Sequence, residues 1–183
     1  MYLTDYTINQ IISFLVQLAA TLIGVFLAFK LDKWWSDVAE KKNKKQILNA
    51  VKQELGVNMH QLIPVIRKNL EELRVPFAPI SFEIWDAIPN KIALVPERAL
   101  GIIGNAYYNL RSLEKALDRF GDYAHGYFSA SDERVKADLK DRVNSVRTVI
   151  LGHLSEPEND KDRKVITAIR EAISKIDNEI KRL

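Results

Sequence analysis

Two stretches of this sequence pair an arginine with a histidine at the same spacing. Arg119 is followed by His125, and Arg147 by His153, with five residues between the members of each pair. An arginine cation can hold a phosphate group, and a histidine can carry protons to and from the ribose oxygens. The chemistry that this pattern favours is therefore cleavage of an RNA phosphodiester.

Each histidine also has a structural interpretation. His125 lies between Gly121 and Gly126, in what we expect to be a loop, and His153 lies near the end of an expected helix, where a cation complements the helix dipole. The three histidines have no clustered ligand spacing, so we expect no metal site and no cofactor. The sequence has no glycine-rich phosphate loop, no G-x-S-x-G and no H-E-x-x-H motif, which excludes the common catalytic templates.

A second set of polar residues interrupts the apolar N-terminal segment. Ser13, Gln17 and Thr21 recur every four residues within the nineteen uncharged residues 11–29. At about 100° per residue of a helix, they share one arc about 100° wide with small side chains. The stripe so defined comprises Ser13, Gln17, Ala20, Thr21, Gly24 and Ala28.

This stripe has two interpretations that the sequence leaves open. Ala20, Gly24 and Ala28 form a small-xxx-small pattern, which lets two helix backbones approach closely. Alternatively, the Gln17 amide and its neighbours line a water-filled channel, because an amide at membrane depth needs a partner or water. A packed seam needs only two helices, whereas a pore needs a ring of roughly five or more, each about 10 Å across.

The uncharged run itself predicts a transmembrane helix. Nineteen residues at 1.5 Å per residue reach about 28 Å, close to the thickness of the hydrocarbon core. Asp5 is the only charged residue before the run, which is unlike a secretory signal peptide.

The residues after the run predict its orientation. They place the C-terminal side in the cytoplasm and the N-terminus outside the inner membrane, in a single pass. Trp34 and Trp35, with Lys30 and Lys33, are expected at the membrane interface. The basic residues concerned are Lys30, Lys33, Lys41, Lys42, Lys44 and Lys45.

The rest of the chain predicts an all-α fold. Of the 183 residues, 28% are charged and 47% are apolar, which suits a folded domain, and there is no cysteine for disulfides or thiolate sites. The net charge of +3 is too balanced to indicate nucleic-acid binding. We expect residues 1–35 to form the tail and transmembrane helix, and residues 36–183 to form a cytoplasmic helical bundle.

Apolar periodicity places the first helices of this bundle. A stripe at three- and four-residue steps predicts an amphipathic helix over 37–75, with a kink near Leu62 because of Pro64. Prolines punctuate the next connection, in which we expect a short helix over residues 82–88 with Trp85 turned inward.

Three further helices are expected in the C-terminal half. The first starts with Pro96 as its first helical residue and ends at Gly121. The second opens at Ser131, and the third begins with Ser155 as its cap and Glu158 three residues later.

The motifs together resemble a known family. A span ending in Leu27-Ala28, with Asp32 and Trp34 after it, resembles many small prokaryotic single-pass membrane proteins with a helical bundle. With an Arg-x5-His motif and this length, the chain also resembles the CRISPR-associated transmembrane HEPN-like accessory protein of type VI-B, RNA-targeting systems.

This resemblance implies a HEPN-like fold and a homo-oligomeric membrane pore that strengthens antiviral defence by disturbing the membrane. It also implies the lipid bilayer and an RNA-guided CRISPR effector as partners, and no small-molecule substrate. The motif pair would be Arg119 with His125, or Arg147 with His153. Active HEPN ribonucleases, which are metal-independent, often carry asparagine after the arginine, where this chain has Phe120 and Thr148.

We therefore predict a non-enzymatic, homo-oligomeric membrane pore that acts as an accessory effector in antiviral defence. Two alternatives remain open from the sequence. One is a membrane-tethered HEPN-type ribonuclease, and the other is a helical scaffold that recruits a partner to the membrane.

Overall fold

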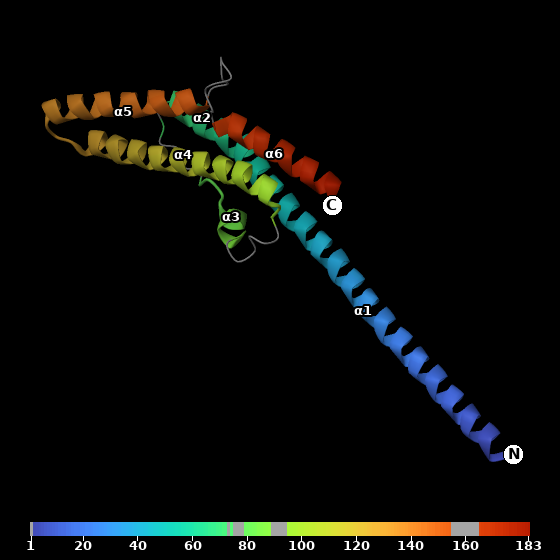
Figure 1. The fold of residues 1–183 in the computed structure, drawn as a ribbon. Coiled ribbons are helices and arrows are strands. Elements are labelled where there is room, and N and C mark those ends of the chain that lie inside the picture. The colour runs from blue at the N-terminus through green and yellow to red at the C-terminus, as the bar shows by residue number, and fades with distance from the viewer. Residues whose placement is uncertain (1, 73, 75–78, 89–94, 155–164) are drawn as a thin grey trace. The chain divides into compact units, whose positions relative to one another are not determined.

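The computed structural model describes residues 2–72, 74, 79–88, 95–154 and 165–183, and side chains from Phe14 onward. All regular structure in these parts of the chain is helical, as the sequence predicts (Figure 1). The chain divides into two compact units, Met1–Asn43 and Lys44–Leu183, a division that falls later than the expected boundary after residue 35.

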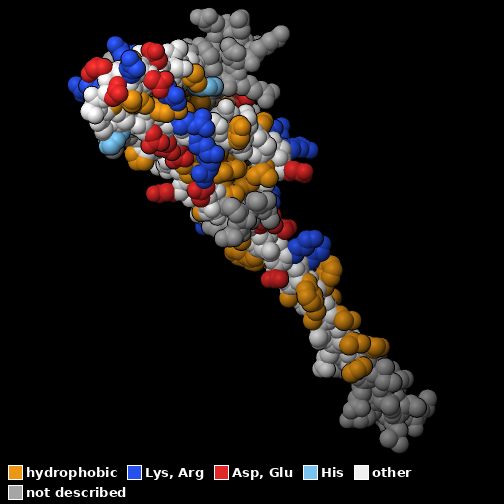
Figure 2. Space-filling view, turned by 90° about the vertical axis from the view of Figure 1, so that its left-hand side faces the viewer, with side chains coloured by type: hydrophobic (Ala, Val, Ile, Leu, Met, Phe, Trp, Pro, Cys, Tyr) orange, Lys and Arg blue, Asp and Glu red, His pale blue; other side chains and the backbone are white. Residues whose placement is uncertain are grey.

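The first helix, α1 (Tyr2–Val57), contains the predicted span. It is long and apolar enough to cross a membrane, and none of the side chains in its most apolar window is buried. The hydrophobic side chains in this part of α1 lie uncovered on its surface (Figure 2). Folded proteins in water rarely expose so large an apolar surface, which is typical of a membrane span or of a surface that contacts another protein.

The helix is irregular near Leu62, where the sequence predicts a kink, and the irregularity is a wider helical turn. One π turn, η1 (Asn58–Leu62), separates α1 from α2 (Ile63–Glu71). Pro64 has no N–H to donate to the carbonyl four residues earlier, and its ring would clash with that carbonyl. A π turn just before Pro64 relieves this conflict.

The short helix and the start of the helix after it lie close to their predicted positions in the middle of the chain. The short helix exists as α3 (Glu83–Ala87), within one residue of the prediction at each end. Pro96 precedes the next helix, α4 (Glu97–Ser129), as its N-cap with φ −56° and ψ 130°, and is not its first helical residue.

The prediction that Gly121 ends this helix is wrong. Helix α4 continues to Ser129 and contains both Gly121 and His125, so His125 does not lie in a loop. Phe120 and Ala124, on the same helix face, are buried at 1% and 4% exposure. Their burial outweighs the penalty of about 1 kcal/mol for a glycine inside a helix.

The last two helices are α5 (Glu133–Leu154) and α6 (Val165–Arg182). Asp132 caps α5, since its carboxylate accepts a hydrogen bond of 2.7 Å from the Arg134 N–H. Helix α6 buries one apolar face, on which Ile169 and Ile176 are fully buried. The expected cap at Ser155 and Glu158 lies outside the described residues.

The core of the second unit is formed between α4 and its neighbours. Helices α4 and α5 run antiparallel, α6 packs on α4, and α2 packs on α5 (Figure 1). The residues that α1 and α2 contribute to this core belong to the apolar stripe predicted over 37–75. They are Leu48, Val51, Leu55, Ile63, Ile66 and Leu70.

Candidate functional site

The predicted stripe lies on the exposed part of α1. Gln17, Ala20, Thr21, Gly24 and Ala28 are all exposed, while the Ser13 side chain lies outside the described ones. A Cβ atom built on Gly24 would meet nothing within 4 Å, so this face has room for another helix. The structure thus leaves the stripe open to other copies, lipid or water.

The two polar side chains of the stripe that the structure describes, Gln17 and Thr21, differ in their hydrogen bonding. The Thr21 hydroxyl donates to the Gln17 carbonyl oxygen at 2.9 Å, so the hydroxyl is satisfied within its own helix. Among the described residues, none forms a hydrogen bond with the Gln17 amide group. An amide without a hydrogen-bond partner costs roughly 2–7 kcal/mol in an apolar medium, so the Gln17 amide would need a partner in such a medium.

The predicted interface residues cluster at the end of the apolar run. The Lys30 ammonium lies 5.6 Å from the centre of the Phe26 ring, close enough for a cation–π interaction. The Trp34 and Trp35 rings meet edge to face at 5.1 Å between centroids, and both are more than half exposed. Lys33 is exposed beside them. This composition is typical of the border between hydrocarbon and headgroups.

Both arginine–histidine pairs lie inside helices. Arg119 and His125 are exposed on α4, and Arg147 and His153 lie on α5. Six residues along a helix separate two positions by about 9 Å and about 120° around the axis. The backbone positions of each pair are therefore well separated along and around one helix.

The Arg147 guanidinium is occupied by the end of another helix. Its Nε donates to the Leu70 carbonyl at 2.7 Å, and an Nη donates to the Glu71 carbonyl at 3.3 Å. These carbonyls close α2, and in return Arg67 of α2 donates to the carbonyl of Leu154, the last residue of α5. The two arginines cap each other's helices, where their charge also complements the helix dipoles.

This capping predicts different stabilities for two arginine variants. We expect Arg147→Ala to lower the free energy of unfolding by about 1.5–3 kcal/mol, because it removes charged hydrogen bonds from the end of α2. The matched variant Arg119→Ala should change it by less than about 0.5 kcal/mol, since Arg119 is exposed. Urea unfolding of the full chain in detergent, followed by circular dichroism, measures both. Equal losses in the two variants would contradict the capping role.

A buried carboxylate that sequence reasoning missed organises the second unit. Glu54 on α1 is 6% exposed and accepts hydrogen bonds from the Ser81 hydroxyl at 2.9 Å and from the Tyr107 hydroxyl. It also accepts from the backbone N–H groups of Ile84 at 2.9 Å and Trp85 at 3.2 Å. These N–H groups belong to the first turn of α3, so Glu54 caps that helix from outside.

Asn58 extends the same network by one helical turn. Its side chain is fully buried, donates to the Ser81 carbonyl at 2.9 Å and accepts from the Ser81 N–H at 3.0 Å. Among the described residues, no buried side-chain nitrogen or oxygen lacks a hydrogen-bond partner. With its buried side-chain donors and acceptors paired, this network holds α3 in place.

Tyr107 is the titratable group that this network perturbs most. Its ring stacks on Trp85, with centroids 4.5 Å apart and planes 13° from parallel, so Trp85 is turned inward as predicted. Burial first, and then the hydrogen bond to Glu54, raise the pKa of Tyr107 above its ordinary value.

The raised pKa of Tyr107 predicts a loss of stability in alkali. Above about pH 10 the unfolded chain releases the phenol proton while the folded chain keeps it, so the free energy of unfolding falls by up to about 1.4 kcal/mol per pH unit. Below that pH the contribution is fully present. Comparing urea unfolding from pH 8 to 11 in the wild type and in Tyr107→Phe isolates this group, and we expect a shallower decline in the variant. Parallel declines would contradict the assignment.

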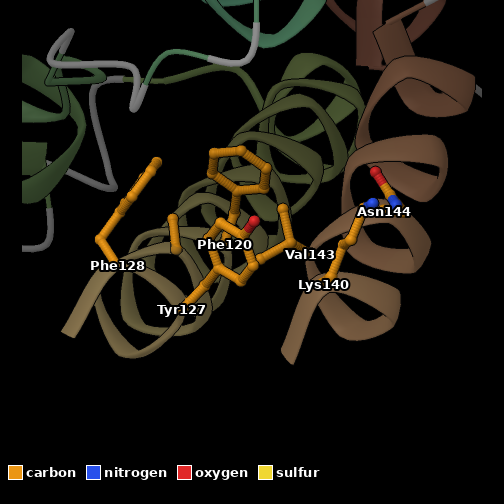
Figure 3. A pocket seen from close by; sticks show the side chains of 7 residues that line it. Phe120, Tyr127, Phe128, Lys140, Val143 and Asn144 are labelled. Atoms are coloured by element: carbon orange, nitrogen blue, oxygen red, sulfur yellow. The ribbon is translucent and has the colours of Figure 1, made fainter. Parts of the chain in front are cut away.

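A small hollow lies between α4 and α5. It measures about 130 Å³, and aromatic residues of α4, among them Phe120, face Val143 on α5 (Figure 3). The lining residues with polar groups are Tyr127, Lys140 and Asn144, and Phe128, which also lines the hollow, is 74% exposed. Ligand pockets usually measure about 300–1,000 Å³, so this hollow is too small for most substrates or cofactors.

Neither metal-ligating side chains nor similarity to known proteins indicates a function for this chain. Among the described residues, no group of three or more histidine, aspartate and glutamate side chains could hold a metal ion. The chain matches no protein-family profile, no curated protein and no solved structure.

Proposed function

We propose that the protein is a single-pass membrane protein whose copies assemble through the stripe on α1 into a pore. The observation that carries this proposal is the Gln17 amide, which is exposed and finds no partner among the described residues. Gln17 lies three residues from the middle of the uncharged run, or about 4.5 Å along the helix. At that depth another copy, or water enclosed by several copies, would satisfy the amide, which no described side chain does.

The side chains around the stripe support the same arrangement. Phe14, Leu18, Leu22 and Phe26 are exposed at 46–62% and lie outside the stripe, where they suit contact with lipid. Lipid alone gives no reason to collect small and polar residues on one face, whereas a neighbouring helix does. The lysines after the run place the second unit on the cytoplasmic side in this proposal.

The subunit number tests the proposal directly. Native mass spectrometry of the full chain released from detergent micelles gives this number without any variant. Five or more copies would support a pore lined by the stripe, because a ring of that size can enclose water between helices about 10 Å wide. A monomer or a dimer would overturn the pore, and a dimer would leave the stripe as a packed seam.

The other expectations have less support. A ribonuclease that uses Arg147 would have to release the end of α2 before this arginine could hold a phosphate. The HEPN-like fold and the accessory role in antiviral defence rest on the resemblance alone, and no observation favours recruitment of a particular partner. All four stay predictions.

A further inference from the structure

The hollow between α4 and α5 has an apolar floor. Phe120 and Ala124 of α4 are buried, and Val143 of α5 lines the hollow with them (Figure 3). A Cβ atom built on Gly126, two residues beyond Ala124, would lie 3.5 Å from a methyl carbon of Leu139 on α5. The two helices therefore pack closely at Gly126, while the small side chain of Ala124 leaves unfilled space beside it.

The size of the hollow suits one six-membered ring. Its volume is about 130 Å³, and an apolar cavity of about 150 Å³ holds one benzene molecule in another protein. The aromatic side chains that line it are Phe120, Tyr127 and Phe128. Aromatic rings attract a further ring edge to face or in an offset stack. A single aromatic ring is thus the apolar group that fits this space.

Three hydrogen-bond donors line the same hollow without a partner. The Lys140 ammonium forms no ion pair, and the Asn144 amide and the Tyr127 hydroxyl form no hydrogen bond, with any residue that the structure describes. Lys140 and Asn144 are exposed and lie next to each other, one turn apart on α5 (Figure 3). A carboxylate has only acceptor atoms, so it complements a set of donors.

The charges around the hollow leave Lys140 available to an anion. None of the lining residues is acidic. On α5, Asp138 accepts a hydrogen bond from Arg142 at 2.8 Å, and Glu133 pairs with Lys136 at 3.1 Å. Asp141 leaves α5 about 160° around the helix from Val143, on the side away from the hollow. Among the described residues, therefore, no carboxylate neutralises the ammonium of Lys140.

From this combination of size, aromatic walls and charge, we propose that the hollow binds a small aromatic carboxylate with a single ring. The ring packs on Phe120 and Ala124, and the carboxylate accepts hydrogen bonds from Lys140 and Asn144. A ligand this small makes few contacts, so the affinity is expected in the millimolar range. The site lies within the second unit and does not depend on how copies of the chain assemble.

Binding of para-fluorobenzoate tests the proposal. Fluorine NMR follows the titration of the full chain in maltoside micelles, with empty micelles subtracted. The variants are Lys140→Met and, as the matched control, Lys115→Met, an exposed lysine of α4 about 180° around the helix from Ala124. We expect saturable binding to the wild type and to Lys115→Met, and about fivefold weaker binding to Lys140→Met, since an exposed charge pair contributes little more.

Two further comparisons separate the ring from the charge. Val143→Phe fills the hollow and keeps Lys140, so it should also weaken binding of para-fluorobenzoate. The uncharged para-fluorobenzamide should bind equally to the wild type and to Lys140→Met.

Four results would overturn the proposal. Equal losses in Lys140→Met and Lys115→Met would mean general attraction to a positively charged surface, and unchanged binding by Val143→Phe would place the ring elsewhere. A loss of the uncharged amide in Lys140→Met would mean that this variant disturbs the hollow itself. The fourth is a wild type that shows no saturable binding up to about 10 mM. Each of these leaves the proposed pore standing, because the subunit number is measured separately.

Discussion

Gln17→Leu should raise the protein concentration needed for half-maximal assembly in detergent by about 5- to 30-fold. Hydrogen bonds between helices in a membrane contribute about 1–2 kcal/mol in model peptides, and each 1.4 kcal/mol is a factor of ten in an equilibrium constant. The leucine has nearly the shape of glutamine but offers no hydrogen bond. Native mass spectrometry or sedimentation across a dilution series measures the shift.

Thr21→Val is the matched control for this prediction. It removes a hydroxyl from the same stripe, but that hydroxyl donates to the Gln17 carbonyl oxygen of its own helix at 2.9 Å. The carbonyl keeps its backbone hydrogen bond, so we expect a shift of less than about twofold. Equal shifts in the two variants would show that volume, not the amide, drives association.

Ion flux through liposomes gives a second measurement of the same variant. If copies enclose water at Gln17, replacing each amide by leucine makes a hydrophobic constriction that excludes water, and flux should fall. Flux and assembly that both match the wild type would contradict any role of Gln17 in a pore. If the wild type carries no ion flux, and Gln17→Leu still weakens assembly, the result would favour a packed seam.

The sequence predicted the helices well because it contains the signal that forms them. Apolar residues at three- and four-residue steps located the helical segment that includes α2, and Pro64 located the irregular turn at Leu62. The error at Gly121 has a physical reason. A glycine ends a helix only when no packing holds the following turn, and here Ala124 is buried three residues later.

The buried network could have been found from the same periodicity. Asn58 falls at a three-residue step after Leu55, in phase with Leu48 and Val51, so a polar residue occupies a core position. Glu54 falls in phase with Val51 in the same way. The partners could not be predicted, because Ser81, α3 and Tyr107 are distant in sequence and meet Glu54 only through the tertiary fold.

Glu54→Gln should be among the most destabilising single substitutions in the second unit. All four groups that hydrogen-bond to the Glu54 carboxylate are donors. They are the hydroxyls of Ser81 and Tyr107 and two N–H groups of α3. A glutamine amide would turn its own NH₂ toward some of these donors, because a carboxylate is acceptor-only and an amide is not. With at least one buried donor left unpaired, we expect a loss of about 3 kcal/mol or more in the free energy of unfolding.

Helix α3 explains why the effect should be this large. It has only five residues, too few to be stable alone, and its first N–H groups depend on Glu54. Glu71→Gln is the matched control: its side chain is exposed, so its unfolding free energy should change by less than about 0.5 kcal/mol. Urea unfolding of the full chain in detergent compares the two. If Glu54→Gln unfolds like the control, the Glu54 carboxylate does not hold α3, and the polar network adds nothing to the fold.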